Sequence, residues 1–334
     1  MPSEEEKGGE ASNGSEGRGS DINVKKLHVN MKSKDIILLI LRLLIGALFI
    51  TTAIMKLVTI DEFEAYIYSF NLFNFLLSTV VARLVIMAEL LLGICLMAKM
   101  LYKYAWWLTM LMLIGFTFFL IYVAIFRNDT NCHCFGDIVQ LDPAHSIIKN
   151  VITMILMLFI RKEEDYQFKW KKWALVAAFA VSFIVPFCVF PMDVVYNKFV
   201  SPIDEVNNTA FEEIQADSTM TDFDISEGNY VVAIYASGCK YCKMSAKRMS
   251  LMMEQNEIDS TKFQILIWGD STHIQQFREE TNCERFPWHV INPFAAIDVV
   301  YGKFPTFILT QDGQVIKGID YRGLDEAVLK EHLK

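Results

Sequence analysis

The sequence predicts an integral membrane α-helical bundle of five transmembrane helices that is followed by an α/β domain. Hydrophobic residues make up 53% of the 334 positions, and most of the excess lies in five long apolar runs. A run of about 18 apolar residues is long enough to cross a bilayer as a helix. After the last run, strand-like and helix-like patterns alternate to the end of the chain. The five runs are residues 36–58, 76–98, 104–126, 143–160 and 173–192.

The charge balance excludes a nucleic-acid-binding protein. The chain has 31 Lys and Arg against 39 Asp and Glu, a formal net charge of −8, whereas nucleic-acid binding requires a basic surface. We therefore expect no nucleic acid among its partners. Seven cysteines are too few for a disulfide scaffold of this length, so the position of each cysteine decides its role.

Basic residues beside the apolar runs predict how the chain is oriented. Residues 1–34 are polar and rich in Gly, Ser and Glu, which predicts a disordered cytoplasmic tail. Loops 99–103 and 161–172 are rich in Lys, whereas loops 59–75 and 127–142 are not. Because basic loops stay on the cytoplasmic side, we expect a multi-pass protein of a cell inner membrane, in contact with lipid, whose N-terminus is cytoplasmic. After five spans the C-terminal domain is then periplasmic.

The same patterns divide the chain into domains. Residues 35–160 are predicted to form a four-helix membrane domain, 161–192 a basic loop and the fifth transmembrane helix, 193–225 a polar linker, and 226–334 the α/β domain. Between the first two spans, residues 60–75 carry apolar side chains at helical spacing. This spacing predicts either a short helix on the outer membrane interface or a plain amphipathic loop.

The ionisable residues inside the predicted spans include Arg42, Lys56, Arg83 and Glu89. Charges are costly in lipid and are usually functional or paired. Arg42 and Glu89 are expected at similar depths in neighbouring antiparallel spans, so we predict an ion pair between them. For Arg42 and Lys56 the alternative is that the long side chain reaches out to the membrane surface.

The C-terminal region holds a Cys-x-x-Cys motif at a predicted strand-to-helix turn. In Ser-Gly-Cys239-Lys-Tyr-Cys242-Lys, the first sulfur is expected at a helix N-terminus, where backbone N–H groups and the helix dipole favour a thiolate. Lys240 and Lys243 are expected to add positive charge nearby. Only a thiolate attacks a disulfide, so we predict an attacking Cys239 and a resolving Cys242. The alternative is half of a zinc site, but no second Cys-x-x-Cys or spaced His pair accompanies the motif.

The predicted elements around this motif resemble the thioredoxin superfamily in their order. The resemblance extends to Lys303-Phe-Pro-Thr306. It implies that Pro305 is cis and packs beside the redox cysteines, with Pro305 and Thr306 on the edge where substrates dock. Lys-Tyr between the cysteines replaces the family's Gly-Pro, so the direction of electron flow stays open. The predicted strands and helices are residues 229–235, 240–255, 262–268, 271–281, 304–309, 314–319 and 324–333.

A second cysteine pair, Cys132 and Cys134, lies in the predicted outer loop 127–142. By the predicted topology, this loop faces the same compartment as the Cys-x-x-Cys motif. A disulfide between residues i and i+2 closes a very small ring, and strained disulfides are the labile ones. We therefore predict a pair that exchanges electrons with the C-terminal domain. The alternatives are a copper or zinc site that includes His133 and an inert structural bridge.

The membrane half resembles the DoxX-like and methylamine-utilisation MauE proteins over residues 36–160. The matching segments are R-L-L-I-G-A-L-F-I-T-T-A-I-M-K-L, A-E-L-L-L-G and C-H-C-F-G-D. The resemblance implies a four-helix bundle with a membrane redox role and contact with quinone, and the MauE branch works beside a thioredoxin-like partner. The layout is also similar to vitamin K epoxide reductase homologues, although no Cys-x-x-Cys lies inside these spans. The single thiols Cys95 and Cys188 are predicted to be packing residues, and Cys283 a plain thiol.

Together these features predict a membrane-anchored thiol–disulfide oxidoreductase. Electrons would pass between periplasmic Cys-containing client proteins, the Cys239/Cys242 pair, the Cys132/Cys134 pair and a quinone, and we expect no metal cofactor. Two other functions fit the same residues. One is a non-catalytic assembly factor that holds a Cys-rich client, and the other is a metal-handling protein that uses the Cys-His-Cys loop.

Overall fold

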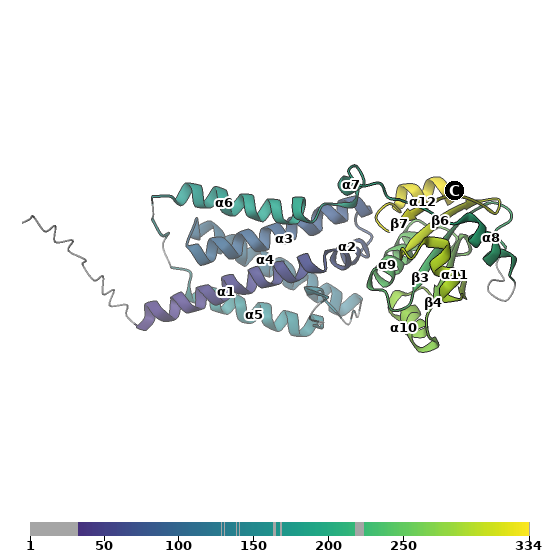
Figure 1. Cartoon of the computed structure of the whole chain (residues 1–334). Coiled ribbons are helices and arrows are strands. Elements are labelled where there is room, and N and C mark those ends of the chain that lie inside the picture. The colour runs from purple at the N-terminus through teal and green to yellow at the C-terminus, as the bar shows by residue number, and fades with distance from the viewer. Residues whose placement is uncertain are drawn as a thin grey trace, which may run out of the picture.

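The computed structural model describes residues 33–127, 129, 131–137, 139, 141–162, 165–167, 169–217 and 224–333. The chain forms two parts, a bundle of long helices and an α/β domain packed on one end of it (Figure 1). Helix α1 begins at the opposite end of the bundle. The predicted disorder of the N-terminal tail concerns residues 1–32, which lie outside the described residues.

The predicted apolar helices are all present. Four helical stretches are long and apolar enough to cross a membrane, and a further apolar helix, α5, is shorter. The prediction of a multi-pass membrane bundle is therefore confirmed. The helices of the bundle are α1 (Ser33–Val58), α3 (Phe75–Ala98), α4 (Tyr102–Phe126), α5 (Pro143–Phe159) and α6 (Lys171–Ile184), which continues into the π-helical turn η1 (Val185–Val189).

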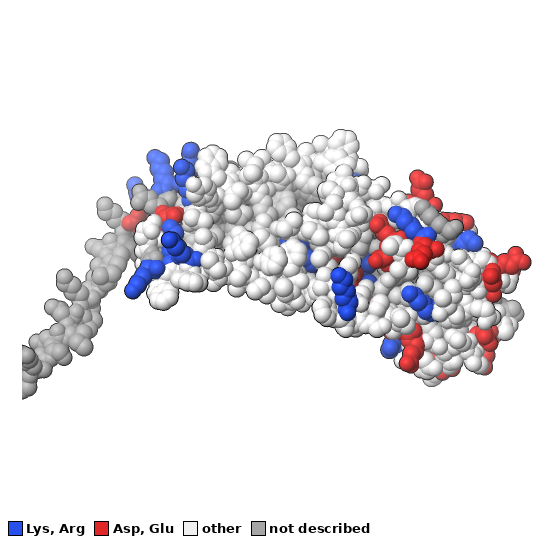
Figure 2. Space-filling model, turned by 90° about the horizontal axis from the view of Figure 1, so that it is seen from above, with Lys and Arg blue, Asp and Glu red and all other residues white. Residues whose placement is uncertain are grey.

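Small residues and apolar surfaces hold this bundle together in the way expected in lipid. A Cβ atom at Gly46 of α1 would lie 2.9 Å from the carbonyl oxygen of Gly93 in α3, so the two backbones approach closely. Large apolar side chains such as Phe118 and Trp173 are exposed on the outside. Figure 2 shows a broad uncharged band along the bundle, with Lys and Arg gathered near the end where α1 begins.

The segment between the first two spans forms helix α2 (Ile60–Tyr68), which confirms the helical alternative. Helix α2 is packed between the bundle and helix α9 of the α/β domain, and its position on the membrane interface stays a prediction. Phe63, Tyr66 and Tyr68 are buried. The amphipathic pattern of α2 therefore reflects contact with protein on its apolar side and not with lipid.

The α/β domain contains one mixed sheet in the order β2-β7-β6-β3-β4-β5. Strand β3 is parallel to β4, which is parallel to β5, whereas β6 and β7 are antiparallel to their neighbours. The strands are β2 (Ile203–Asp204), β3 (Asn229–Ala236), β4 (Phe263–Trp268), β5 (Trp288–Val290), β6 (Thr306–Gln311) and β7 (Gln314–Asp320). This arrangement is consistent with the predicted thioredoxin-like α/β domain.

Helices cover both faces of the sheet. Val231, Ala233 and Tyr235 of β3 share a core with α9, α10 and α12, whereas Val232 and Ile234 share a second core with α8 and α11. Burial on both faces explains why β3 is an unbroken apolar run in the sequence. The helices are α8 (Asn208–Ala216), α9 (Lys240–Gln255), α10 (Ser271–Thr281), α11 (Pro293–Val300) and α12 (Glu326–Leu333).

The predicted linker 193–225 is wrong in its described part. Strand β2 pairs with β7, and α8 places Phe211 and Ile214 in the core. The domain therefore includes residues from 203 onward, and only a short connector with the helical turn α7 (Asp193–Tyr196) joins it to the bundle. Residues 218–223 lie outside the described residues.

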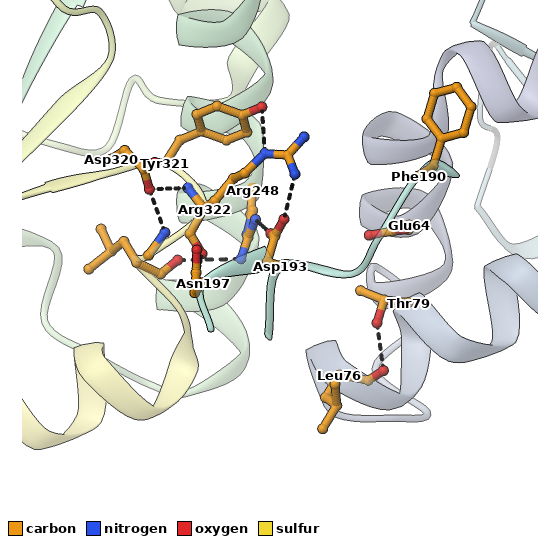
Figure 3. A network of polar contacts seen from close by, with 12 residues as sticks. Glu64, Leu76, Thr79, Phe190, Asp193, Asn197, Arg248, Asp320, Tyr321 and Arg322 are labelled. Carbon is orange, nitrogen blue, oxygen red and sulfur yellow. Dashed lines mark hydrogen bonds and ion pairs between the residues drawn. The ribbon is translucent and has the colours of Figure 1, made fainter. Parts of the chain in front are cut away.

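Polar contacts dock the α/β domain onto the bundle (Figure 3). Arg248 of α9 donates to Asp193 of the connector at 2.5 Å, and its guanidinium carbon lies 4.1 Å from the ring centroid of Phe75. The Tyr68 hydroxyl donates to Glu326 of α12, and the backbone oxygen of Tyr68 accepts from Gln255 at 2.8 Å. The structure thus holds the two parts in contact through α2, the start of α3 and the connector.

Candidate active site

The Cys239/Cys242 pair lies at the junction of β3 and α9, where the sequence predicted it. Cys239 is the N-cap residue of α9, and its sulfur accepts the backbone N–H of Cys242 at 3.3 Å. Cys242 is fully buried, whereas Cys239 is only partly buried. A reagent or a protein disulfide can therefore reach the first sulfur and not the second.

Hydrogen bonds at the helix start set the charge of this pair. The Cys242 thiol and the backbone N–H groups of Cys242 and Tyr241 lower the pKa of the Cys239 thiol to about 6. Burial and the same thiol contact raise the pKa of Cys242. The expected contribution of Lys243 is not present, because its ammonium pairs with Glu280 at 2.7 Å. Cys239 is thus a thiolate at neutral pH, as an attacking thiol must be.

The peptide bond between Phe304 and Pro305 is cis, as the thioredoxin resemblance implies. Thr306 begins β6 and pairs with Ile234 of the strand that leads to the cysteines. The hydroxyl of Thr306 donates to the backbone oxygen of Lys303 at 2.9 Å. The turn is therefore fixed beside β3, and substrate docking on Pro305 and Thr306 stays a prediction.

The Cys132/Cys134 pair lies in the connection between α4 and α5, with Cys134 at the start of strand β1 (Cys134–Asp137). The Cys132 sulfur accepts the Cys134 N–H at 3.4 Å and lies 2.9 Å from the Ser146 hydroxyl of α5. Gly136 has a φ of +64°, and a Cβ atom there would lie 2.7 Å from the backbone oxygen of Met55. The loop therefore packs directly against the end of α1 at Gly136, where any residue with a Cβ atom would clash.

Hydrogen bonds also separate the two thiols of this loop in acidity. The Cys134 thiol, the Ser146 hydroxyl and the Cys134 N–H lower the pKa of Cys132 to about 6. The contact with Cys132, together with burial, raises the pKa of Cys134. Both cysteines are free thiols in this structure. As in the first pair, the first cysteine holds the charge and the second keeps the proton.

An apolar cavity of about 230 Å³ opens directly beneath this second pair, inside the bundle. Aromatic side chains from α2 and α4 form much of its wall. Its polar residues are few and come from α1, α3, α5 and the cysteine loop. They include Lys56, Glu89, Lys149, Asn150, Cys132 and Cys134.

Two ion pairs account for three of the four predicted intramembrane charges. Lys56 donates to both carboxylate oxygens of Glu89, at 2.6 and 2.8 Å, and both side chains are buried. The predicted Arg42–Glu89 pair is therefore wrong, and so is the idea that Lys56 reaches out to the membrane surface. Span depth alone did not show that Lys56 of α1, rather than Arg42, contacts Glu89 of α3.

Arg83 pairs with Glu64 of α2 and donates to the backbone oxygen of Phe190 at 3.1 Å. The partner Glu64 was missed because α2 was expected on the membrane surface, where a carboxylate needs no partner. Arg42 is buried in the first half of α1. These charges therefore lie inside the protein and not in lipid.

The other cysteines take different positions. Cys95 is in the core of the bundle, as predicted, and Cys283 is buried with its sulfur 3.6 Å from the backbone oxygen of Ala246. Cys188 is exposed on the outer side of η1, so its prediction as a packing residue is wrong. Among the described residues, no three His, Cys, Asp or Glu side chains cluster closely enough to hold a metal ion.

The two cysteine pairs lie toward the same end of the bundle but do not touch. No hydrogen bond joins one pair to the other in the part of the chain that the structure describes. His133 stacks on Tyr66 at 4.4 Å between centroids and borders a second cavity, of about 200 Å³, together with Met244 and Lys247 of α9. The docked domain thus places the middle of α9, and not its reactive end, beside the loop.

Comparison with known proteins supports the division into two parts. Residues 34–162 match the family described as methylamine utilisation protein MauE. The chain is also similar to Protein TlpB of Flavobacterium psychrophilum, with 25% identity over 304 residues that cover 75% of this chain and 82% of that protein. No solved structure matches the chain. Residues 34–162 are therefore similar to MauE proteins, and an α/β domain of thioredoxin-like form follows them.

Proposed function

We propose that this chain is a membrane-anchored thiol–disulfide oxidoreductase. One observation carries the proposal: two separate cysteine pairs have the same division into a first thiol whose pKa is about 6 and a second thiol whose pKa is raised. A structural cysteine needs no such division, whereas disulfide exchange requires a thiolate to attack and a second thiol to resolve. Electrons pass between a client protein, Cys239/Cys242 and Cys132/Cys134.

A quinone is the acceptor that best fits the cavity below Cys132 and Cys134. Aromatic walls suit an apolar ring, and the ammonium groups of Lys56 and Lys149 are hydrogen-bond donors that suit its carbonyl oxygens. When bound there, a quinone supplies a two-electron acceptor within the membrane. The residues of this chain hold it, exclude water and keep the thiolate of Cys132 at the polar end.

The proposed orientation places the N-terminus in the cytoplasm and both cysteine pairs in the periplasm of a cell inner membrane. Basic side chains near the end where α1 begins (Figure 2) support it. A membrane-impermeant thiol reagent should label Cys239 in intact spheroplasts. Labelling only after the membrane is broken would show the opposite orientation.

The function is tested by trapping the mixed disulfide in the full-length chain. Exchange passes through such a bond, and the bond persists when the resolving thiol is missing. Cys242→Ser should therefore accumulate a bond from Cys239 to Cys132 or Cys134, identified as a cross-linked peptide. Cys283→Ser is the matched control, because Cys283 is buried in the same domain and should trap nothing.

The other outcomes separate the alternatives. If Cys239 traps only client proteins, the two parts are not coupled and the bundle is an anchor. Retained function in Cys239→Ser, with client binding intact, would indicate a non-catalytic assembly factor. Stoichiometric binding of Cu(I) that requires Cys132 and Cys134 would indicate metal handling.

A further inference from the structure

Lys149 of α5 is a charged residue that no sequence motif singles out, and it lines the same cavity as the loop cysteines. It lies one helical turn after Ser146, whose hydroxyl is 2.9 Å from the Cys132 sulfur. Its ammonium lies 4.8 Å from the ring centroid of Phe135, the residue next to Cys134. The side chain of Lys149 therefore extends toward the cysteine loop.

Among the carboxylates whose side chains the structure describes, none forms an ion pair with the Lys149 ammonium, and Glu89 is bound by Lys56. Cations in such surroundings are usually paired, because an uncompensated charge in an apolar site is strongly destabilising. The contact with Phe135 is a cation–π interaction, which offsets only part of that cost.

The charges of the cavity balance when one cysteine is ionised. Lys56 and Glu89 cancel each other, and Lys149 leaves one positive charge at the cavity wall. Arg127 and Asp129, in the same loop region, pair with each other at 3.0 Å. With a thiolate at Cys132, the charged side chains of the cavity sum to zero. With a Cys132–Cys134 disulfide, one positive charge remains as long as Lys149 is protonated.

We propose that Lys149 is the counter-ion of the Cys132 thiolate and stores the proton that this thiol gives up. This role rests on the proposed oxidoreductase function. It is supported by the lowered pKa of Cys132, to which the Cys134 thiol contributes most, the Ser146 hydroxyl next among the favourable causes, and the Lys149 charge in addition. The counter-ion thus couples the redox state of the pair to the protonation of one lysine.

The electron and proton balance follows directly. The reduced pair consists of the Cys132 thiolate, the Cys134 thiol and the Lys149 ammonium. When the Cys132–Cys134 bond forms, two electrons leave to a quinone, with one proton from the Cys134 thiol and one from Lys149, and a quinol results. Lys149 is then a neutral amine beside an uncharged disulfide. Reduction by Cys239/Cys242 restores the thiolate and the thiol, and Lys149 regains its proton from water.

Several other titratable and charged groups surround Cys132. They are Cys134 and His133 in the loop, Lys56 on α1, Tyr66 on α2, Glu89 on α3, and Arg127 and Asp129 after α4. Tyr66 donates to Asp129 at 3.3 Å and is neutral, because burial and Asp129 raise its pKa. Among the described side chains, Lys149 is therefore the cation of the Cys132 cavity that forms no ion pair with a carboxylate.

The test measures alkylation of Cys132 against pH in the full-length protein in lipid nanodiscs, read peptide by peptide by mass spectrometry. Loss of an opposite charge close to a thiolate raises its pKa by about one unit or more. Lys149→Gln should therefore slow Cys132 alkylation about threefold at pH 6.5 and about tenfold at pH 5, whereas Lys149→Arg should change it less than about twofold. Lys103→Gln, at the opposite end of the bundle, is the matched control and should leave the profile unchanged.

Two readouts keep the proposal falsifiable. Cys95 is buried in the core of the bundle, so slow alkylation of Cys95 in the same samples reports that the bundle of Lys149→Gln is folded. An unchanged Cys132 profile in a folded Lys149→Gln protein, or a Lys149→Arg protein as slow as Lys149→Gln, would overturn the role of Lys149. Separately, decyl-benzoquinone should oxidise reduced Cys132/Cys134 in the wild type. If it does not, the quinone of the proposed function is wrong, while the alkylation result still decides the counter-ion.

Discussion

The two cysteine pairs reach the same division of charge on different scaffolds. Cys239 depends on the first turn of α9, whose own backbone N–H groups contact its sulfur. Cys132 lies in a short loop, and its lowered pKa depends first on the Cys134 thiol and then on a hydroxyl and a charge supplied by α5. The first scaffold is complete within one domain, whereas the second exists only while α1, α5 and the loop are packed together.

The two attacking thiols also differ in how far they are exposed. Cys239 is partly exposed at the surface of a domain that faces water, which suits exchange with proteins. Cys132 is buried above an apolar cavity in the bundle, which suits exchange with a small apolar molecule. In the proposed function, the same thiol chemistry thus serves two kinds of partner, because one pair is placed on a helix end and the other above an apolar cavity.

The sharpest way to break this comparison is to remove each thiolate in turn. Cys239→Ser should reduce exchange with a disulfide-bonded peptide to the uncatalysed rate, because the attacking sulfur is lost. Cys132→Ser should leave that reaction intact and abolish only the transfer of electrons to the membrane. Peptide reduction and quinol formation, measured side by side, check both. A loss of peptide reduction in Cys132→Ser would show that the two pairs do not have separate roles.

The reduction potentials of the two pairs should depend differently on pH. Below about pH 6 reduced Cys239/Cys242 holds two protons, and above it only one, because the Cys239 thiol is ionised while the disulfide binds none. The potential of this pair should therefore fall with pH half as steeply above pH 6 as below it, whereas that of Cys132/Cys134 should keep the two-proton slope near neutral pH because Lys149 takes up the second proton. Redox titration of the full chain between pH 5 and 8, with alkylation of each pair followed separately, measures this. A bend near pH 8.5 would mean that the Cys239 thiol has the pKa of a free cysteine.

Ser146 distinguishes the scaffolds by a smaller effect. A hydrogen bond to a charged group contributes about 1.5 kcal/mol, so Ser146→Ala should raise the pKa of Cys132 by roughly one unit. Ser245→Ala is the control in the other pair, because the Ser245 hydroxyl donates to the backbone oxygen of Cys242 and not to a sulfur. The pH dependence of alkylation reports both. An equal shift at Cys239 in Ser245→Ala would contradict the account of the first pair.

The smallest expected effect concerns the docking of the α/β domain onto the bundle. Tyr68→Phe removes the hydrogen bond to Glu326 and should weaken the interface by about 1 kcal/mol, or roughly fivefold in the undocked population. Hydrogen exchange of the contact face of α9 should rise accordingly. Tyr301→Phe, on the exposed end of α11, is the control. Faster exchange in the control, or none in Tyr68→Phe, would show that this contact does not hold the domain.

Local patterns predicted much of this molecule because local physics forms it. The apolar runs specified the spans, and the Cys-x-x-Cys turn specified the N-cap at Cys239, since both depend on neighbours in the sequence. Helices α9 and α10 begin and end where the pattern predicted. The short strand β5 and helix α11 were missed, because three residues of strand carry no periodicity and α11 is apolar on most sides.

Long-range pairing accounts for what the sequence could not show. The partner of Glu89 depends on how α1 and α3 rotate against each other, which span depth alone does not determine. Lys149 was missed because a lone lysine near the start of an apolar run is ordinary at a membrane surface. Its place beside the cysteines follows only from the way α5 packs against the loop.

The short connector has a consequence for kinetics. Because residues from 203 onward belong to the α/β domain, the segment 190–202 is the tether, with a reach on the order of 40 Å when fully extended. A catalytic head on so short a tether meets its membrane partner at an effective concentration in the millimolar range. Transfer between the pairs should then be first order in protein and insensitive to dilution, and each head should serve its own bundle.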